Sequence, residues 1–406
     1  MKKNQTPGIN FILVTVLIDA ISFGIVIPVF PELIKTMQGC NDGQAAVITS
    51  WMMASFAIAQ FIFSPVQGSL SDRFGRRPIL LASLFGFGLD YLLLAFAPSI
   101  GWLFAGRILA GILGASYTTA LAYVADVSTD EDKAKNYGKL GAAFGLGFIL
   151  GPGIGGLLGD IHLKLPFILC AILSLVNWLY GFLILPESHK PENVSRFEKK
   201  SFIPGISLIQ AVQYKKILGL LLSFFLLYLA AQAVMTNWSF YTIHKFQWDS
   251  TKIGISITVV GLMVAFVQGY LVRKVNPKIG NHRSVTIGLL LYALGMLGFG
   301  LAPSGFIMIL SIVPYCLGGI NGPAMQAMMS NNVADNEQGK LQGVITSLQS
   351  LTSIFGPLLM GGIFNYFTAD QHVYFPGAAF ITAAGLILAA WVIALWSMKK
   401  QGIYKA

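Results

Sequence analysis

The sequence predicts an all-α membrane protein that crosses the bilayer twelve times, and three observations lead to this prediction. First, 55% of the 406 residues are hydrophobic and only 11% are charged, against about 25% charged residues in a soluble domain. Second, apolar runs close to the roughly 20 residues of a transmembrane helix recur along the whole chain. Third, basic residues gather in alternate segments between these runs, as the positive-inside rule requires. The composition excludes a soluble enzyme, a disordered chain and a nucleic-acid binder, although the formal net charge is +10.

Twelve apolar windows are expected to be membrane spans, six before a polar stretch and six after it. In order, they lie near residues 9–31, 45–69, 78–98, 101–124, 136–159, 165–185, 217–243, 252–273, 283–302, 305–328, 341–367 and 373–397. The polar stretch is too short for a folded domain. We therefore expect an N-terminal six-helix bundle over residues 1–186, a cytoplasmic linker over 187–216 and a C-terminal six-helix bundle over 217–406.

The distribution of Lys and Arg predicts the orientation of the chain. With the N-terminus inside, the linker cluster and most loop arginines and lysines lie inside, and the basic residues left outside are Lys35, Lys164, Lys245 and Lys252. Both termini are therefore expected in the cytoplasm. The three cysteines are far apart and have no metal-binding spacing, so the sequence predicts no disulfide, no metal site and no cofactor.

The two halves of the chain carry similar segments at corresponding places. A Gly68–Arg77 segment follows the second span, and a similar Gly269–Arg283 segment follows the eighth. Gly-Pro pairs lie in the fifth span at Gly151 and in the eleventh at Gly356. A parallel repeat of two six-helix halves is the architecture of a transporter whose substrate site lies near mid-membrane between the halves.

The strongest motif follows the second span and is predicted to be a cytoplasmic gate that holds the halves together. A basic inner loop explains its arginines but neither its glycines nor its acid. Gly68 would let the second span approach another helix closely, and Asp72 would favour a helix N-terminus, such as that of the eleventh span. The motif residues are Gly68, Asp72, Arg73, Gly75, Arg76 and Arg77.

This segment resembles the loop 2–3 signature of the major facilitator superfamily, and other segments agree with that resemblance. Gly106-Arg107 in the fourth span resembles the Arg motif of the superfamily, and residues 147–156 resemble the signature of its drug:proton antiporters. Residues 89–96 and 141–147 resemble the tetracycline-resistance antiporters, and the likeness is sharper over 19–187 than beyond 217. The resemblance implies the major facilitator fold, a location in the bacterial inner membrane and exchange transport. It also supports a pairing of Asp126 with Arg76 in the gate, where a lone interfacial Asp is the alternative.

Glycines of the fifth span recur at four-residue spacing and are predicted to pack against a neighbouring helix. Gly147, Gly151, Gly155 and Gly159 form one such stripe, and Gly141 and Gly145 form another pair. Pro152 and Gly156 belong to the same packing motif. The resemblance makes this span a contact to the C-terminal half, although ordinary packing within a bundle would also explain the glycines. Residues 151–156 also fit a dinucleotide-binding fingerprint, which the transmembrane surroundings exclude.

Three ionisable residues lie inside apolar spans: Asp19, Asp90 and Arg107. Each costs roughly 2.5–3.5 kcal/mol at the centre of a lone helix. From the helical rise, all three lie about 15–20 Å from the inner ends of their spans. A structural Asp–Arg pair would account for only one of the two acids. The remaining carboxyl could take up and release a proton, so we expect these residues to couple transport to protons.

The C-terminal half is expected to contribute neutral substrate contacts, namely Gln232, Asn237, Trp238, Tyr292 and Gln326. Each of its polar groups could equally join helices. Relative to the tetracycline family, the ninth-span acid falls at Tyr292 and the eighth-span histidine at Val264. These departures predict weak or absent protection against tetracycline itself.

We therefore expect a monomeric, proton-coupled antiporter that exports a small amphipathic drug-like compound, with tetracyclines as leading candidates from the resemblance. Its expected partners are that small molecule, protons and the lipid bilayer, with no nucleic acid. The alternative is a carrier for a metabolite or siderophore, with or without proton coupling. A membrane enzyme would need a nucleophile or metal motif that the spans lack, and a receptor would not need two intramembrane acids.

Overall fold

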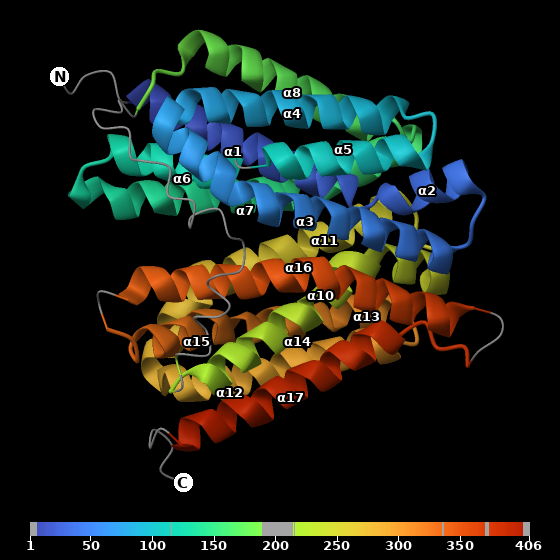
Figure 1. Ribbon diagram of the computed structural model, residues 1–406. Helices are drawn as coiled ribbons and strands as arrows, with labels where there is room; N and C mark the ends of the chain where they lie inside the picture. Colours follow the sequence, from blue (N-terminus) through green and yellow to red (C-terminus); the bar gives the residue numbers. More distant parts are fainter. Residues whose placement is uncertain are drawn as a thin grey trace. The chain divides into compact units, whose positions relative to one another are not determined.

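The computed structural model describes residues 6–114, 116–188, 214, 216–334, 337–369 and 373–400. The regular elements in these ranges are helices (Figure 1). In chain order they are α1 (Thr6–Val26), α2 (Phe30–Gln38), α3 (Asp42–Phe74), α4 (Arg76–Phe96), α5 (Ile100–Leu113), α6 (Ser116–Val127), α7 (Asp130–Ile161), α8 (Leu165–Ile184), α10 (Leu218–Phe246), α11 (Ser250–Phe266), α12 (Val272–Leu301), α13 (Gly305–Leu310), α14 (Ile312–Leu317), α15 (Asn321–Ser330), α16 (Gln338–Thr368) and α17 (Ala378–Lys400).

The helices confirm the expected polytopic, all-α membrane fold. Eleven stretches of the described chain are long and apolar enough to cross a membrane, and one of them, Ser250–Leu301, is 52 residues long. This long stretch contains Gly280, whose φ of 81° and ψ of 159° are not helical. Gly280 divides the stretch into the expected eighth and ninth spans, so the described chain holds twelve membrane-crossing segments.

The expected first and last spans each ran past a break in the helix, and a proline lies at each break. The first span was expected to reach residue 31, but α1 ends at Val26 and a turn that contains Pro28 separates it from α2. The last span was expected to begin at residue 373, but α17 begins at Ala378, directly after Pro376 and Gly377. Proline lacks the backbone N–H that a helix interior requires, so it interrupts or precedes a helix.

The chain divides into two compact units. Unit 1 comprises residues 1–39, 55–204 and 249–258, and unit 2 comprises 40–54, 205–248 and 259–406. Two short segments belong to the other unit than the sequence half in which they lie. The N-terminal end of α3 belongs to unit 2, and the N-terminal part of α11 belongs to unit 1.

Unit 1 is organised around the packing of α1 against α7, and α4 lies alongside α8 and α5 (Figure 1). A Cβ added at Gly147 or Gly151 would collide with the α1 backbone at Leu17 or Ile21. One turn further, Gly155 meets Ile25 in the same way. Equal four-residue steps on both helices let the two backbones run in contact.

The remaining residues of this glycine motif face a different helix of unit 1. A Cβ at Gly156 would overlap the carbonyl of Ser250, and one at Gly254 would overlap that of Pro152. Asp160 accepts hydrogen bonds from the backbone N–H groups of Ser250 and Thr251, at 3.1 and 3.0 Å, at the start of α11. The end of α7 therefore holds the beginning of α11.

Unit 2 packs α10 against α16 and α17, and α12 against α17, α14 and α15. Its core contains an aromatic cluster in which Phe299 contacts Trp238, Tyr315 and Phe380, with ring centroids 5.0, 5.2 and 5.8 Å away. Tyr241 stacks edge-on against Phe380 and donates a 2.7 Å hydrogen bond to the carbonyl of Phe299. These contacts fix α10, α12 and α17 to one another.

Candidate functional site

The structure pairs two of the three predicted intramembrane charges. Asp90 of α4 and Arg107 of α5 form an ion pair between Oδ2 and Nη2. Asp90 is completely buried, and the Arg107 side chain is 16% exposed. Gly106 makes room for the pair, because a Cβ there would press on the Asp90 carboxylate. The pair satisfies two charges that would each be costly alone in an apolar bundle.

The third charge, Asp19 of α1, has no such counter-ion. Both of its carboxylate oxygens are buried, and no group in the described ranges meets hydrogen-bond geometry with either. The Ser116 side chain of α6 lies beside this carboxyl. Tyr91, which follows Asp90 in α4, is close enough to interact electrostatically with Asp19. The three predicted residues therefore belong to one region of unit 1, with one carboxyl paired and the other left over.

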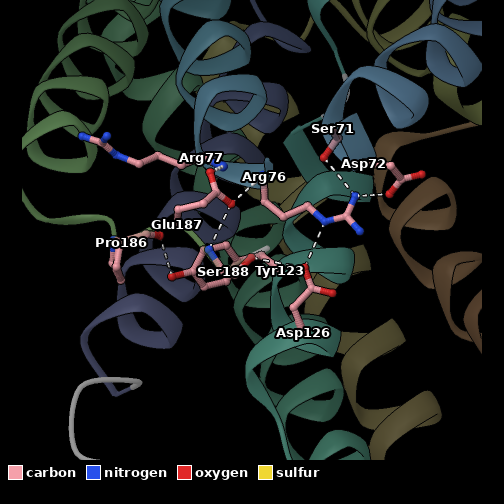
Figure 2. A network of polar contacts seen from close by, with 9 residues as sticks. All are labelled: Ser71, Asp72, Arg76, Arg77, Tyr123, Asp126, Pro186, Glu187 and Ser188. Carbon is pink, nitrogen blue, oxygen red and sulfur yellow. Dashed lines mark hydrogen bonds and ion pairs between the residues drawn. The ribbon is translucent and has the colours of Figure 1, made fainter. Parts of the chain in front are cut away.

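The predicted gate motif forms a polar network around Arg76, which Figure 2 shows. The Arg76 Nε donates a 3.0 Å hydrogen bond to Asp126 of α6, and one Nη donates to Ser71 Oγ at 3.1 Å. The same Nη also pairs with the Asp72 carboxylate. The Arg76 side chain is 11% exposed, and this one arginine joins the end of α3 to α6. The sequence-based pairing of Asp126 with Arg76 is present in the structure.

The α3–α4 turn of this network depends on Gly75. Its φ of 99° and ψ of 164° lie in a backbone region that residues with a Cβ rarely adopt. The Glu187 carboxylate, which follows α8, accepts hydrogen bonds from the backbone N–H groups of Arg76 and Arg77 at 2.8 and 3.1 Å. A Cβ on Gly75 would collide with that carboxylate. Glu187 therefore caps the N-terminus of α4, where a negative charge is favoured by the helix dipole.

The segment after α8 is attached to the same network by two further hydrogen bonds (Figure 2). Tyr123 of α6 donates to the carbonyl of Pro186 at 3.1 Å, and Ser188 Oγ donates to the Asp126 carboxylate at 3.2 Å. Tyr123, Glu187 and Ser188 were not predicted from the sequence. The only available signal was an acid, Glu187, directly after an apolar span.

The other motif residues differ in their surroundings. The Arg77 side chain extends away from the Arg76 cluster and donates a 2.7 Å hydrogen bond to the Phe182 carbonyl (Figure 2). Arg73 lies over the Phe74 ring, 5.3 Å from its centroid. A Cβ built on Gly68 would meet no heavy atom of the described chain within 4 Å. The close helix approach expected at Gly68 stays a prediction.

The predicted substrate residues of the C-terminal half lie in unit 2, and two of them are deep in its core. Asn237 is fully buried and donates a 2.9 Å hydrogen bond to the carbonyl of Met360. Trp238 is 2% exposed and packs edge-on against Phe299. Both side chains join α10 to neighbouring helices. For the polar groups of this half, joining helices was the stated alternative to contacting substrate.

The remaining three are more accessible. The Tyr292 hydroxyl donates to that of Tyr315 at 3.2 Å. Gln232 is half-buried against Gly356, and Gln326 is exposed. Of the five predicted contacts, these three retain surface that a ligand could reach.

A polar contact that the sequence analysis did not anticipate lies in unit 2. His244 of α10 has Nδ1 2.9 Å from an Asp42 carboxylate oxygen and Nε2 3.1 Å from the Tyr374 hydroxyl. The three residues are far apart in the sequence and connect α3, α10 and the segment before α17. No group of three or more His, Cys, Asp or Glu side chains in the described parts of the chain could hold a metal ion.

Comparison with known families identifies the fold. The family model described as Major Facilitator Superfamily matches residues 12–322 and 278–402. The chain belongs to the Major Facilitator Superfamily. Solved transporter structures share the fold: a human organic anion transporter (TM-score 0.70, 21% identity, 97% of this chain and 100% of that one) and a nucleoside transporter (TM-score 0.77, 13% identity, 98% and 99%).

Several relatives match this major facilitator over nearly its whole length. The class C tetracycline resistance protein of Escherichia coli is 38% identical over 388 residues, 96% of each chain. The class H protein of Pasteurella multocida is 33% identical over 396 residues, 98% of each chain. Multidrug resistance protein 2 of Bacillus subtilis (strain 168) is 30% identical over 411 residues, 99% of this chain and 98% of that one. The resemblance to the tetracycline resistance proteins is confirmed, and the protein is a multi-pass membrane transporter of the Major Facilitator Superfamily, not an enzyme.

Proposed function

We propose that this transporter is a proton-coupled antiporter that exports small amphipathic, drug-like molecules. The observation that carries the proposal is the unequal number of charges in the interior of unit 1. Two carboxyls, Asp19 and Asp90, accompany one arginine, Arg107, and only Asp90 is paired with it.

The two acids have different roles in this proposal. Asp90 is held ionised by Arg107, because separating the pair would leave a buried arginine charge without a partner. Asp19 lacks a counter-ion and can become neutral by binding a proton, which is how buried acids avoid the cost of a bare charge. Asp19 is therefore the proton carrier, and the Asp90–Arg107 pair sets the electrostatic field in which it titrates. Intramembrane acids of transporters commonly serve as proton relays.

The relatives support a drug-like substrate, since those reported above are named for resistance to tetracycline or to several drugs. Tetracyclines are therefore candidates. The neutral Tyr292 at the position of the family's ninth-span acid favours less charged, amphipathic ligands over a metal-chelated drug. A mostly apolar site with a few polar groups suits such molecules.

The Arg76 network serves as the cytoplasmic gate in this proposal, in a monomer of the bacterial inner membrane with both termini in the cytoplasm. Arg76 joins α3 to α6, and Glu187 joins α4 to the segment after α8. Any movement of these helix ends relative to one another must break charge-assisted hydrogen bonds, which are stronger than neutral ones. The network can therefore set how fast the cytoplasmic side opens and closes.

The test is proton release from the purified protein and ΔpH-driven transport in proteoliposomes, with a panel of amphipathic drugs that includes tetracycline. Adding a transported drug should release protons from the wild type but not from Asp19→Asn. The Asp19→Asn and Asp90→Asn variants should both lose uphill transport. Glu32→Gln is the matched control, because Glu32 forms an exposed pair with Lys35 and should transport normally.

Undiminished ΔpH-driven transport in both the Asp19→Asn and Asp90→Asn variants would refute proton coupling through these acids. Transport of none of the drugs would instead favour the alternative, a carrier for a metabolite or siderophore. The two outcomes are distinguishable. The first concerns proton coupling through Asp19 and Asp90, and the second concerns only which molecule is transported.

A further inference from the structure

Unit 2 contains a turn with nearly the same backbone conformation as the turn at Gly75 in unit 1. Gly280 has φ of 81° and ψ of 159°, against 99° and 164° at Gly75, and a new helix begins after each glycine. In unit 1, the segment after α8 lies beside the turn and contributes Glu187. In unit 2, the end of α17 lies beside the turn, where Met398 Sδ is 3.1 Å from His282 Nδ1. The two turns therefore occupy equivalent places in the two units.

The two turns differ in what lies at the start of the new helix. In unit 1, the first backbone N–H groups of α4 donate to the Glu187 carboxylate at 2.8 and 3.1 Å. A Cβ on Gly75 would collide with that carboxylate, whereas one on Gly280 would meet no heavy atom of the described chain within 4 Å, those of unit 2 included. The first N–H groups of a helix have no partner within that helix. The described part of unit 2 therefore places no carboxylate where unit 1 has one.

The sequence around the turn of unit 2 is basic. Four basic residues flank the turn, namely Arg273, Lys274, Lys278 and Arg283. Residues 250–334 and 397–406 include no Asp or Glu. When the two segments are aligned on their glycines, Pro277 takes the position of Asp72, and Asn281 takes that of Arg76. Unit 2 therefore keeps the turn but lacks the acids that balance the arginines of unit 1.

An open cavity of about 330 Å³ is lined by both arms of this turn and by residues 323–324 of α15. Its lining includes Arg273 and Asn281, one from each arm, and Asn276. Asn276 is 9% exposed, and its Nδ2 donates a 3.1 Å hydrogen bond to the carbonyl of Ile320. Its Oδ1 is buried and has no hydrogen-bond partner in the described chain. The wall of the cavity therefore contains a cation and a buried acceptor that needs a donor.

The cavity lies at the level where a membrane span ends. Arg273 and Lys274 directly follow the apolar part of the eighth span. The Lys274 ammonium donates a 2.6 Å hydrogen bond to the Tyr270 hydroxyl and lies 4.5 Å from the centroid of that ring. Tyrosine is enriched at the interface between membrane and water, and basic residues at the cytoplasmic ends of spans. Basic pockets at the cytoplasmic ends of helices suit the phosphate groups of anionic lipids.

We propose that this cavity of unit 2 binds the headgroup of an anionic phospholipid, with the phosphate at the N–H groups that follow Gly280 and beside Arg273. The lipid then supplies the negative charge that Glu187 supplies in unit 1. Because Asn276 Oδ1 needs a donor, the headgroup also carries hydroxyl groups, as that of phosphatidylglycerol does. This site goes beyond the proposed export function and depends neither on proton coupling nor on the substrate.

The direct test measures binding of phosphatidylglycerol to the full-length protein in detergent by native mass spectrometry, which counts the bound lipids. Arg273→Gln removes the cation from the cavity wall and should weaken binding of the tightest lipid about fivefold. Lys340→Gln is the matched control, because Lys340 has a carboxylate partner of its own, Glu337, at 3.7 Å. It should bind phosphatidylglycerol as the wild type does.

A second pair of variants adds a charge to the cavity instead of removing one. Pro277→Asp restores the acid that unit 1 has at the equivalent position and should repel the phosphate, which weakens binding at least fivefold. Pro277→Asn has nearly the same shape without the charge and should bind as the wild type does. Both variants remove a proline from the interior of a helix, so both should fold.

Three other ligands identify the chemistry that the cavity recognises. Phosphatidylethanol has the charge of phosphatidylglycerol but no headgroup hydroxyl, and the loss of one hydrogen bond should weaken its binding about twofold to tenfold. Phosphatidylethanolamine has no net charge and should bind more weakly than phosphatidylglycerol by at least as much. Glycerol 1-phosphate has the phosphate and hydroxyls without acyl chains and should not displace the lipid.

The proposal is overturned if phosphatidylglycerol and phosphatidylethanolamine bind equally, or if Pro277→Asp binds the lipid as tightly as Pro277→Asn. It is also overturned if Arg273→Gln weakens binding no more than Lys340→Gln does. Equal binding of phosphatidylethanol would refute the hydroxyl contact at Asn276. Displacement by glycerol 1-phosphate would show that the cavity takes a soluble phosphate ester and would refute the lipid.

Discussion

Replacing Asp90 by Asn distinguishes a structural ion pair from a proton-coupling one. The substitution leaves the Arg107 guanidinium without its carboxylate partner. The guanidinium stays positively charged, because arginine does not lose its proton in proteins. Removing one partner of a buried pair costs roughly 3–5 kcal/mol. Because the Arg107 side chain is 16% exposed, water recovers part of that loss, so we expect about 3 kcal/mol, the lower end of the range. For a unit of this size, that corresponds to a fall in the apparent Tm of about 6–12 °C.

The double variant Asp90→Asn/Arg107→Gln removes both charges and should recover most of that stability. It should still fail in ΔpH-driven transport, because the field that acts on Asp19 is gone. The assays are thermal unfolding in detergent and proton-driven uptake in proteoliposomes, with Glu32→Gln as the unchanged control. If the double variant regained both stability and coupled transport, the pair would be purely structural and the coupling role of Asp90 would be refuted.

Four further outcomes test other parts of the argument. Arg76→Ala should loosen the cytoplasmic gate and slow turnover more than it weakens substrate binding; unchanged cysteine accessibility of the cytoplasmic side would contradict this. Glu187→Gln removes the charge of a helix cap and should cost about 1 kcal/mol, seen as an apparent Tm lowered by a few degrees; an unaltered Tm would show that the cap contributes nothing. Gly151→Leu should abolish transport because its side chain collides with α1, whereas Gly385→Leu should not; a fully active Gly151→Leu protein would remove the packing argument. Strong tetracycline resistance in a pump-deficient bacterium would refute the restriction drawn from the neutral Tyr292, which predicts weak or absent protection.

The fold was predictable because the bilayer limits the possible structures. A spanning segment must satisfy all of its backbone hydrogen bonds internally, so long apolar runs become helices and their number can be counted. The helices agree with the expected spans, and the differences lie in details that hydropathy does not encode. Pro28 ends α1 early, and Gly280 separates two spans within a helix that is otherwise continuous from Ser250 to Leu301.

The candidate site was only partly predictable because its partners come from distant parts of the chain. Arg76 and Asp72 are four residues apart, on either side of the Gly75 turn, so the sequence already places their side chains near one another. Glu187 is more than a hundred residues from the turn that it caps, and its role depends on how α4 and α8 lie together. An acid after a span looks the same in the sequence whether it caps a helix or lies in solvent.

The glycines show why spacing alone could not decide function. Gly147 and Gly145 belong to the same helix and to similar four-residue patterns, yet Gly147 lies against the α1 backbone and Gly145 faces open space. The difference arises from α1, whose path along α7 follows one face only. That arrangement gives α7 a packed face, which holds Asp19 in position through α1. A substitution on the packed face should therefore disturb folding and coupling together, whereas one at Gly145 should leave the packing of α1 against α7 intact.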